Sequence, residues 1–101
     1  MFDKIREAEQ KAGDIKKRLD AISVSGTAEG GKITVNANAN KVIQSIHIDD
    51  DFFKDADKEE LEELLLVAIN KAMDQADNVS QSEMAALTQQ MFGGLGGIFG
   101  K

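Results

Sequence analysis

The chain of 101 residues carries a formal net charge of −6 and contains one histidine and no cysteine, proline, tryptophan or tyrosine. The absence of cysteine excludes a disulfide framework and any thiolate nucleophile or metal ligand, and is typical of proteins of the reduced cytoplasm. The N-terminus is charged from Asp3 onward and no apolar run approaches the roughly 18 residues of a membrane span, so we predict a soluble cytoplasmic protein without a signal peptide or a membrane partner.

The charge is divided unevenly along the chain. Residues 1–41 carry eight Lys/Arg against six Asp/Glu, a net of +2, whereas residues 42–101 carry four against twelve, a net of −8. The distribution of charge matters more than its total for where a polyanion can make contact. The N-terminal part is therefore the candidate contact region.

Residues 3–22 are predicted to form a helix whose apolar residues recur at spacings of three and four, the a/d pattern of a heptad. A stripe this narrow suits a helix that meets another helix edge-on better than one that lies on a sheet. Gly13 is unfavourable inside this helix by roughly 1 kcal/mol relative to alanine. The seam supplies the candidate dimer-interface residues, which are Ile5, Ala8, Ala12, Ile15, Leu19 and Ile22.

The same helix carries basic residues, three of which lie seven residues apart in one stripe beside the seam, spanning about 20 Å. Such a stripe could follow the phosphates of a DNA duplex. The candidate DNA-binding residues are Lys4, Lys11, Lys16, Lys17 and Arg18. The alternative is that they are solvated and paired along the helix, because Glu7 precedes Lys11 by four residues and Asp14 precedes Arg18 by four.

From residue 22 to residue 48 the apolar period changes to two, which predicts strands. Turn residues at 29–31 and near 38–41 divide this stretch into a three-stranded antiparallel meander. Asn36, Asn38 and Asn40 fall on one side of the middle strand and are interpreted as part of a solvated polar face. Three strands need a covering layer to be stable.

Two helices are predicted to follow. Asp57-x-x-Glu60 has the form of a capping box and begins a helix over 57–79, whose wide apolar stripe, centred on Leu65, suits a helix lying on a sheet. Ser80-x-x-Glu83 has the same form and predicts a break near residue 79 and a short helix over 80–91. The glycine-rich segment 93–101 is predicted to be a flexible tail. Residues 1–92 thus form one α+β domain of order α-β-β-β-α(-α).

No constellation of catalytic or metal-binding residues emerges. The run Asp49-Asp50-Asp51 lacks the spacing of an EF-hand and is interpreted as a solvated loop before a helix. His47 has no second histidine or cysteine to complete a metal site. We predict a protein that is not an enzyme and uses no cofactor, metal or small-molecule substrate.

The stretch from Gly31 to Ala72, GKITVNANANKVIQSIHIDDDFFKDADKEELEELLLVAINKA, resembles the YbaB/EbfC family of bacterial nucleoid-associated proteins. The resemblance lies in Gly-x-Ile-x-Val-Asn from Gly31, Ile-x-Ile-Asp from Ile46, and Leu-Glu-Glu-Leu at 61–64 followed by Ala-x-Asn-x-Ala from Ala68. No single motif is specific, but their order and spacing together are. The resemblance implies a homodimer with projecting helices that binds double-stranded DNA in the nucleoid with little sequence selectivity.

A second hypothesis remains open. The chain could be a protein–protein interaction module that uses the heptad helix and the apolar tail and does not bind DNA. Salt separates the two, because DNA affinity falls steeply with salt whereas an apolar helix interface hardly responds.

Overall fold

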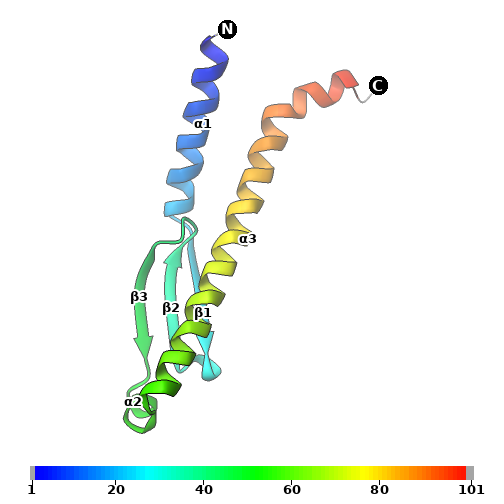
Figure 1. Cartoon of the computed structure of the whole chain (residues 1–101). Helices are drawn as coiled ribbons and strands as arrows, with labels where there is room; N and C mark the ends of the chain where they lie inside the picture. The colour runs from blue at the N-terminus through cyan, green and yellow to red at the C-terminus, as the bar shows by residue number, and fades with distance from the viewer. Residues whose placement is uncertain (1, 100–101) are drawn as a thin grey trace.

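The computed structural model of the protein describes the backbone of residues 2–99 and the side chains of residues 4–7 and 9–90. The elements in chain order are α1 (Phe2–Asp20), β1 (Ser23–Ala28), the 3-10 turn η1 (Glu29–Gly31), β2 (Ile33–Asn38), β3 (Ile43–Ile48), α2 (Asp50–Asp55) and α3 (Lys58–Phe99). The three strands form one antiparallel sheet in the order β1-β2-β3 (Figure 1). The predicted α+β class and the meander are confirmed.

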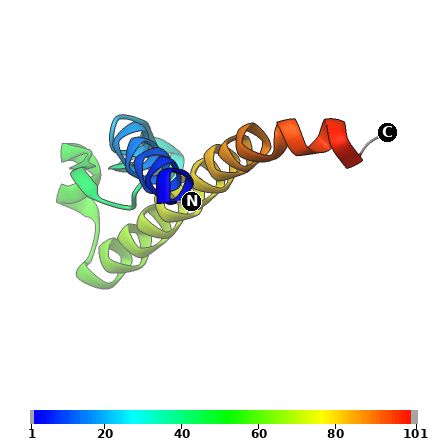
Figure 2. The same ribbon diagram turned by 90° about the horizontal axis from the view of Figure 1, so that it is seen from above.

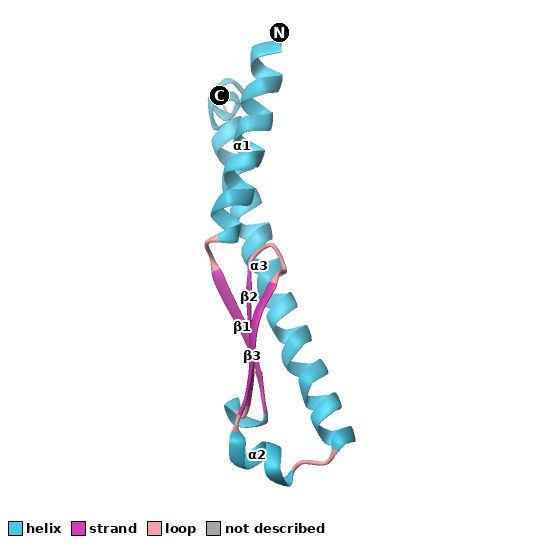
Figure 3. Cartoon of the chain, turned by 90° about the vertical axis from the view of Figure 1, so that its left-hand side faces the viewer, coloured by secondary structure: helices cyan, strands magenta, loops and turns pink. Residues whose placement is uncertain are grey.

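One face of the sheet is covered by α3 and the other is not covered by any described element (Figure 3). The burial of β1 and β2 alternates along each strand as a half-buried sheet requires. The core that results is built of small and β-branched residues: Val24, Ala28, Ile33, Val35, Ala37, Ala68, Ala72 and Ala76. Because α3 presents alanines at the centre of the contact, its axis comes close to β1. Leu65, predicted at the centre, lies at the side and is only partly buried.

The edges of the sheet differ. β1 is one edge, and its Ser25 N–H donates a hydrogen bond to Gln75 Oε1 of α3 at 2.7 Å. β3 is the other edge. The Gln75 side chain of the covering helix therefore accepts a hydrogen bond from an N–H group that β1 could otherwise donate to an added strand.

The turn between β2 and β3 holds the end of α1. Asn38 is 6% exposed, and its Oδ1 accepts hydrogen bonds from the N–H groups of Asn40 at 2.9 Å and Val42 at 3.1 Å. Asn40 Nδ2 in turn donates to the backbone oxygen of Lys16 at 2.9 Å and to Asp20 Oδ1. The interpretation of these asparagines as a solvated face was therefore wrong for Asn38 and Asn40, which organise the turn and dock α1 on it.

The acidic segment after β3 is helical where a loop was predicted. Asp49 is the N-cap of α2, because its Oδ2 accepts a hydrogen bond from the Phe52 N–H at 3.0 Å. Carboxylates near a helix N-terminus are stabilised by the free N–H groups there. The predicted cap of the next helix is confirmed, since Asp57 Oδ1 accepts from the Glu60 N–H at 2.8 Å.

A single helix, α3, replaces the two helices predicted at 57–79 and 80–91. Ser80-x-x-Glu83 matches a capping box in sequence but lies within this helix. Residues 58–92 contain no glycine and the chain contains no proline, so nothing forces the helix to end near residue 79. The backbone of α3 also continues to Phe99 through the segment predicted to be flexible, of which residues 100–101 lie outside the described part of the chain.

The molecule is elongated, with extents of 63 × 28 × 17 Å and a radius of gyration of 19.3 Å. A compact chain of about 100 residues has a radius of gyration near 13 Å. The excess comes from two arms, defined as α1 and the part of α3 from residue 80 onward, which project beyond the sheet. Both chain termini lie at this end, opposite α2 (Figure 1), and the view from above shows α1 standing beside α3 (Figure 2).

Candidate nucleic-acid interface

The arm formed by α1 is basic near its base. Over residues 11–18 the chain carries four Lys/Arg and one acidic residue, Asp14. Lys17 and Arg18 occupy the last turn, where cations interact favourably with the helix C-terminus. Leu19, which is 5% exposed, anchors the end of the helix against the β2–β3 turn. The basic residues are thus held on a helix that projects from a fixed base.

The five candidate DNA-binding residues do not share one face. Lys4, Lys11 and Arg18 form the predicted stripe because they are seven residues apart, whereas Lys16 and Lys17 point in other directions at 100° per residue. Lys4, Lys11, Lys16 and Lys17 are all exposed. Exposed lysine side chains that could contact DNA phosphates therefore lie on several sides of α1.

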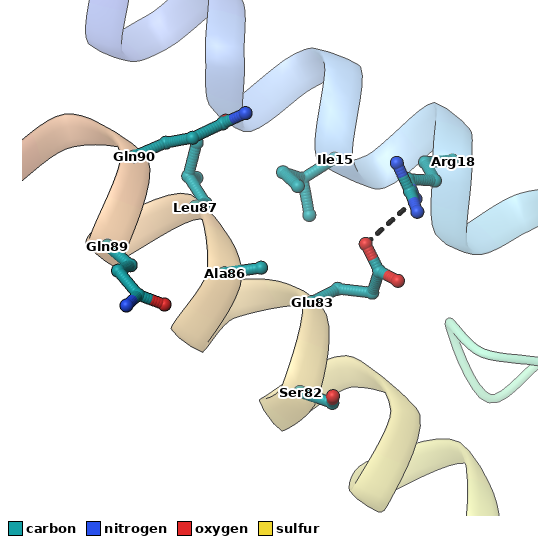
Figure 4. A pocket seen from close by; sticks show the side chains of 8 residues that line it. All are labelled: Ile15, Arg18, Ser82, Glu83, Ala86, Leu87, Gln89 and Gln90. Carbon is teal, nitrogen blue, oxygen red and sulfur yellow. Dashed lines mark ion pairs between the residues drawn. The ribbon is translucent and has the colours of Figure 1, made fainter. Parts of the chain in front are cut away.

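Arg18 is the exception within the candidate set. Its Nε lies 2.8 Å from Glu83 Oε2 of α3, an ion pair that joins the two arms (Figure 4). The sequence suggested Asp14 as its partner from the spacing of four, and the observed partner is 65 positions away in the chain. No local pattern could have indicated that contact.

A groove of about 440 Å³ lies between the arms. Ile15 of α1 points across it toward Ala86 and Leu87 of α3 (Figure 4), and Lys11 and Gln90 lie farther along. A volume of this order matches a small-molecule pocket and not a nucleic-acid duplex. A duplex is too large to enter the space between α1 and α3 of one chain.

The predicted heptad seam is divided between two environments. Leu19 is buried and Ile15 and Ile22 are partly buried, so this end of the seam packs within the chain. Ile5 is 54% exposed and Ala12 is exposed. The side chain of Ala8 lies outside the described residues. A role of the exposed end in dimer formation stays a prediction.

A second apolar surface, which the sequence did not single out, lies beside β3. Ile46 and Val35 are paired across the sheet, so Ile46 points to the α3 side, yet it remains 48% exposed. α3 lies over β1 and β2 and leaves β3 uncovered. Ile43, paired with the buried Ala37, is 41% exposed on the same side.

Residues of α3 continue this surface. Leu66, Met73 and Asp77 are seven and four residues apart and share one side of the helix. Asp77 pairs with Lys41 of the β2–β3 turn, so that side of α3 faces the β3 edge of the sheet. Leu66 is 59% exposed there. We call Ile43, Ile46, Leu66 and Met73 the β3 surface.

The described residues include no group of three or more His, Asp or Glu side chains that could hold a metal ion. His47 is exposed and paired with Thr34, on the side of the sheet away from α3. Within the described part of the chain, no helix is both long and apolar enough to cross a membrane.

Comparison with known proteins gives a consistent result. The family model described as the YbaB/EbfC DNA-binding family matches residues 1–91. A nucleoid-associated protein of Flavobacterium johnsoniae is 36% identical, with 88% of this chain and 82% of that protein covered. One from Chloroflexus aurantiacus is 38% identical, with 93% and 90% covered. The crystal structure of an uncharacterized Helicobacter pylori protein matches with a TM-score of 0.73 at 15% identity, covering 83% of this chain and 88% of that one, which shows a shared fold.

Proposed function

The chain belongs to the YbaB/EbfC DNA-binding family, and from this premise we propose that it is a homodimeric nucleoid-associated protein that binds double-stranded DNA with little sequence selectivity. The observation that supports this most directly is the exposed set of lysines on α1, a helix that projects from the sheet. We assign the protein no catalytic role and place it in the cytoplasm, on the nucleoid.

A net charge of −6 by itself disfavours contact with a polyanion such as DNA, but the acidic and basic residues are separated in space. Residues 49–63 contain nine acidic and two basic residues, and they lie at the α2 end, opposite the end toward which α1 projects (Figure 1). Screening at physiological salt limits electrostatic interactions of exposed charges to about 8 Å. In a molecule 63 Å long, the acidic end therefore has little influence on a phosphate near α1.

The kind of residue exposed supports low selectivity. Lysine side chains on a helix surface contact phosphates, which fix position but carry no base sequence. The exposed part of α1 offers Lys4, Lys11, Lys16 and Lys17 and, in the described residues, no aromatic side chain for stacking on bases.

The β3 surface supports the homodimer. A three-stranded sheet covered by one helix is a small core, and here its largest fully buried side chains are Ile33 and Val35. The same apolar surface on a second copy, related by a two-fold axis, would cover both. The dimer would then present two copies of α1 to a duplex.

A titration with duplex DNA of random sequence at several salt concentrations tests this function. Replacing Lys11, Lys16 and Lys17 by glutamine removes six cations from a dimer. Each phosphate contact contributes about −0.9 to the slope of log affinity against log salt, and we expect the slope to flatten by about 2–3 units because Asp14 already offsets part of the charge.

The matched control replaces Lys54, Lys58 and Lys71 by glutamine, which removes as many charges from α2 and the sheet-covering part of α3 and should leave the slope nearly unchanged. A wild-type protein that fails to bind duplex DNA even at low salt would contradict the proposal. If the protein instead binds a protein partner with an affinity that does not depend on salt, the interaction-module hypothesis is supported.

A further inference from the structure

Glu83 is placed unusually for a surface carboxylate. It is the one acidic residue between Asp77 and the C-terminus of the chain. Its side chain is only 20% exposed, because it turns toward α1 and meets Arg18, whose side chain remains 66% exposed. On an arm otherwise almost free of charge, the single carboxylate is thus directed at the basic face of the other arm.

Apolar side chains lie beside the ion pair. Ile15, Ala86 and Leu87 form the apolar wall beside it (Figure 4), and Leu87 is 9% exposed. Lys11 and Asp14 are the other charged residues that line the groove. Among the described residues, Arg18–Glu83 is the one ion pair that links α1 to α3.

We propose that Glu83 is a positioning residue that lowers the DNA affinity of the protein by holding Arg18 and neutralising its charge. This inference rests on the proposed function. A phosphate that approaches Arg18 also meets the carboxylate 2.8 Å from its Nε, so the pair attracts a phosphate far less than a free guanidinium does. Exposed ion pairs are weak, so a phosphate can compete with Glu83 for the guanidinium. Arg18 can therefore contact DNA, but Glu83 limits how much this contact contributes to DNA affinity.

Glutamine at position 83 tests the inference, because Glu83→Gln keeps side-chain length and helix propensity while removing the charge. Four proteins are compared by duplex DNA titration over a range of salt: the wild type, Glu83→Gln, Arg18→Gln and the double variant. We expect Glu83→Gln to bind about five- to tenfold more tightly at moderate salt and to steepen the slope by about 1–2 units, since a dimer gains two free Arg18 side chains. In the Arg18→Gln background the same substitution should change the slope by less than about half a unit.

Asp74→Asn is the matched control, since it removes one negative charge from an exposed position of the same helix. The inference is overturned if Glu83→Gln increases DNA affinity no more than Asp74→Asn does. It is also overturned if Glu83→Gln increases DNA affinity equally in the wild-type and Arg18→Gln backgrounds. Weaker binding by Glu83→Gln also overturns it, because Glu83 would then support DNA contact. If neither the wild type nor Glu83→Gln binds at low salt, the proposed function itself fails. Binding by Glu83→Gln alone would support the inference in its strongest form.

The chain has no cysteine, so spin labels can be attached to two introduced cysteines alone. They measure the distance between the two arms in the absence of DNA. Spin labels at Gln10→Cys and Thr88→Cys, both exposed positions, give the distance between α1 and α3. We expect the distribution of this distance to broaden in Glu83→Gln and in Arg18→Gln alike. An unchanged distribution in both variants would show that the ion pair does not hold Arg18 against α3, which overturns the inference.

Discussion

A Cβ atom on Gly26 of β1 would lie 2.1 Å from the carbonyl oxygen of Ala68 and 2.4 Å from the backbone nitrogen of Ala72 in α3. Both are atoms of the helix backbone and cannot rotate away. Gly26, Ala68 and Ala72 are all buried, so strand and helix touch here through their main chains. The contact sets the distance between the sheet and its covering helix.

Gly26→Ala is therefore expected to be severely destabilising. The added methyl group requires α3 or β1 to move, and overpacking of this kind costs about 3 kcal/mol, with larger values where backbone must shift. We expect the thermal midpoint to fall by more than about 10 °C in a domain of this size. Thermal unfolding followed by circular dichroism measures the change, and a midpoint within a degree or two of the wild type would contradict the packing described.

Gly13→Ala is the opposite case. Gly13 lies within α1 and a Cβ built on it meets nothing within 4 Å. Alanine in an exposed helix interior stabilises by about 0.5–1 kcal/mol relative to glycine, partly by restricting the unfolded chain. The same unfolding experiment should show a small rise in the midpoint, and a fall would mean that α1 does not persist as a helix around residue 13.

Asn38→Ala should cost about 1–3 kcal/mol of stability. The substitution leaves the N–H groups of Asn40 and Val42 without their acceptor in a turn that is partly buried. Asn36→Ala is the control, because the Asn36 side chain makes one exposed hydrogen bond, to Ser45 Oγ. Denaturant unfolding compares the two, and equal losses would argue against the role assigned to Asn38.

Ile46→Asp should dissociate the proposed dimer. The substitution places a carboxylate in the β3 surface, where burial against a second copy would leave it unpaired. Light scattering is expected to give twice the chain mass of 10.9 kDa for the wild type and the monomer mass for the variant. His47→Asp makes the matching change on the opposite face of the same strand and should leave the dimer intact. A wild-type monomer at tens of micromolar would exclude the homodimer.

The first helix, the three strands and the start of α3 could be predicted because each depends on a local pattern, whereas α2 was predicted as a loop. The change from a heptad period to a period of two marks the step from α1 to the sheet, and Asp57 identifies the start of α3. The end of α3 could not be predicted in the same way, since a capping-box sequence at residue 80 is compatible with a helix interior.

The residues at the centre of the contact between α3 and the sheet were predicted less well, for a different reason. Hydrophobicity favours leucine as the centre of a buried stripe, whereas close approach of a helix to a strand requires small residues. Ala68 and Ala72 therefore occupy the centre and Leu65 the side. The exposure of Ile46 depends likewise on which strands α3 covers. In the candidate interface, the accessibility of the lysines followed from the helix pattern, but the Arg18–Glu83 pair required the fold.

The hydrogen bond from Ser25 to Gln75 has a consequence for assembly. Sheets that are open at both edges can add copies of themselves without limit, and fibres result. Here β1 is occupied at Ser25 by a side chain of α3, and β3 is the edge without such a contact among the described residues. A molecule in which one edge is hindered in this way is less able to add copies at both edges. Gln75 thus disfavours open polymerisation through the β1 edge and is compatible with the proposed closed pair.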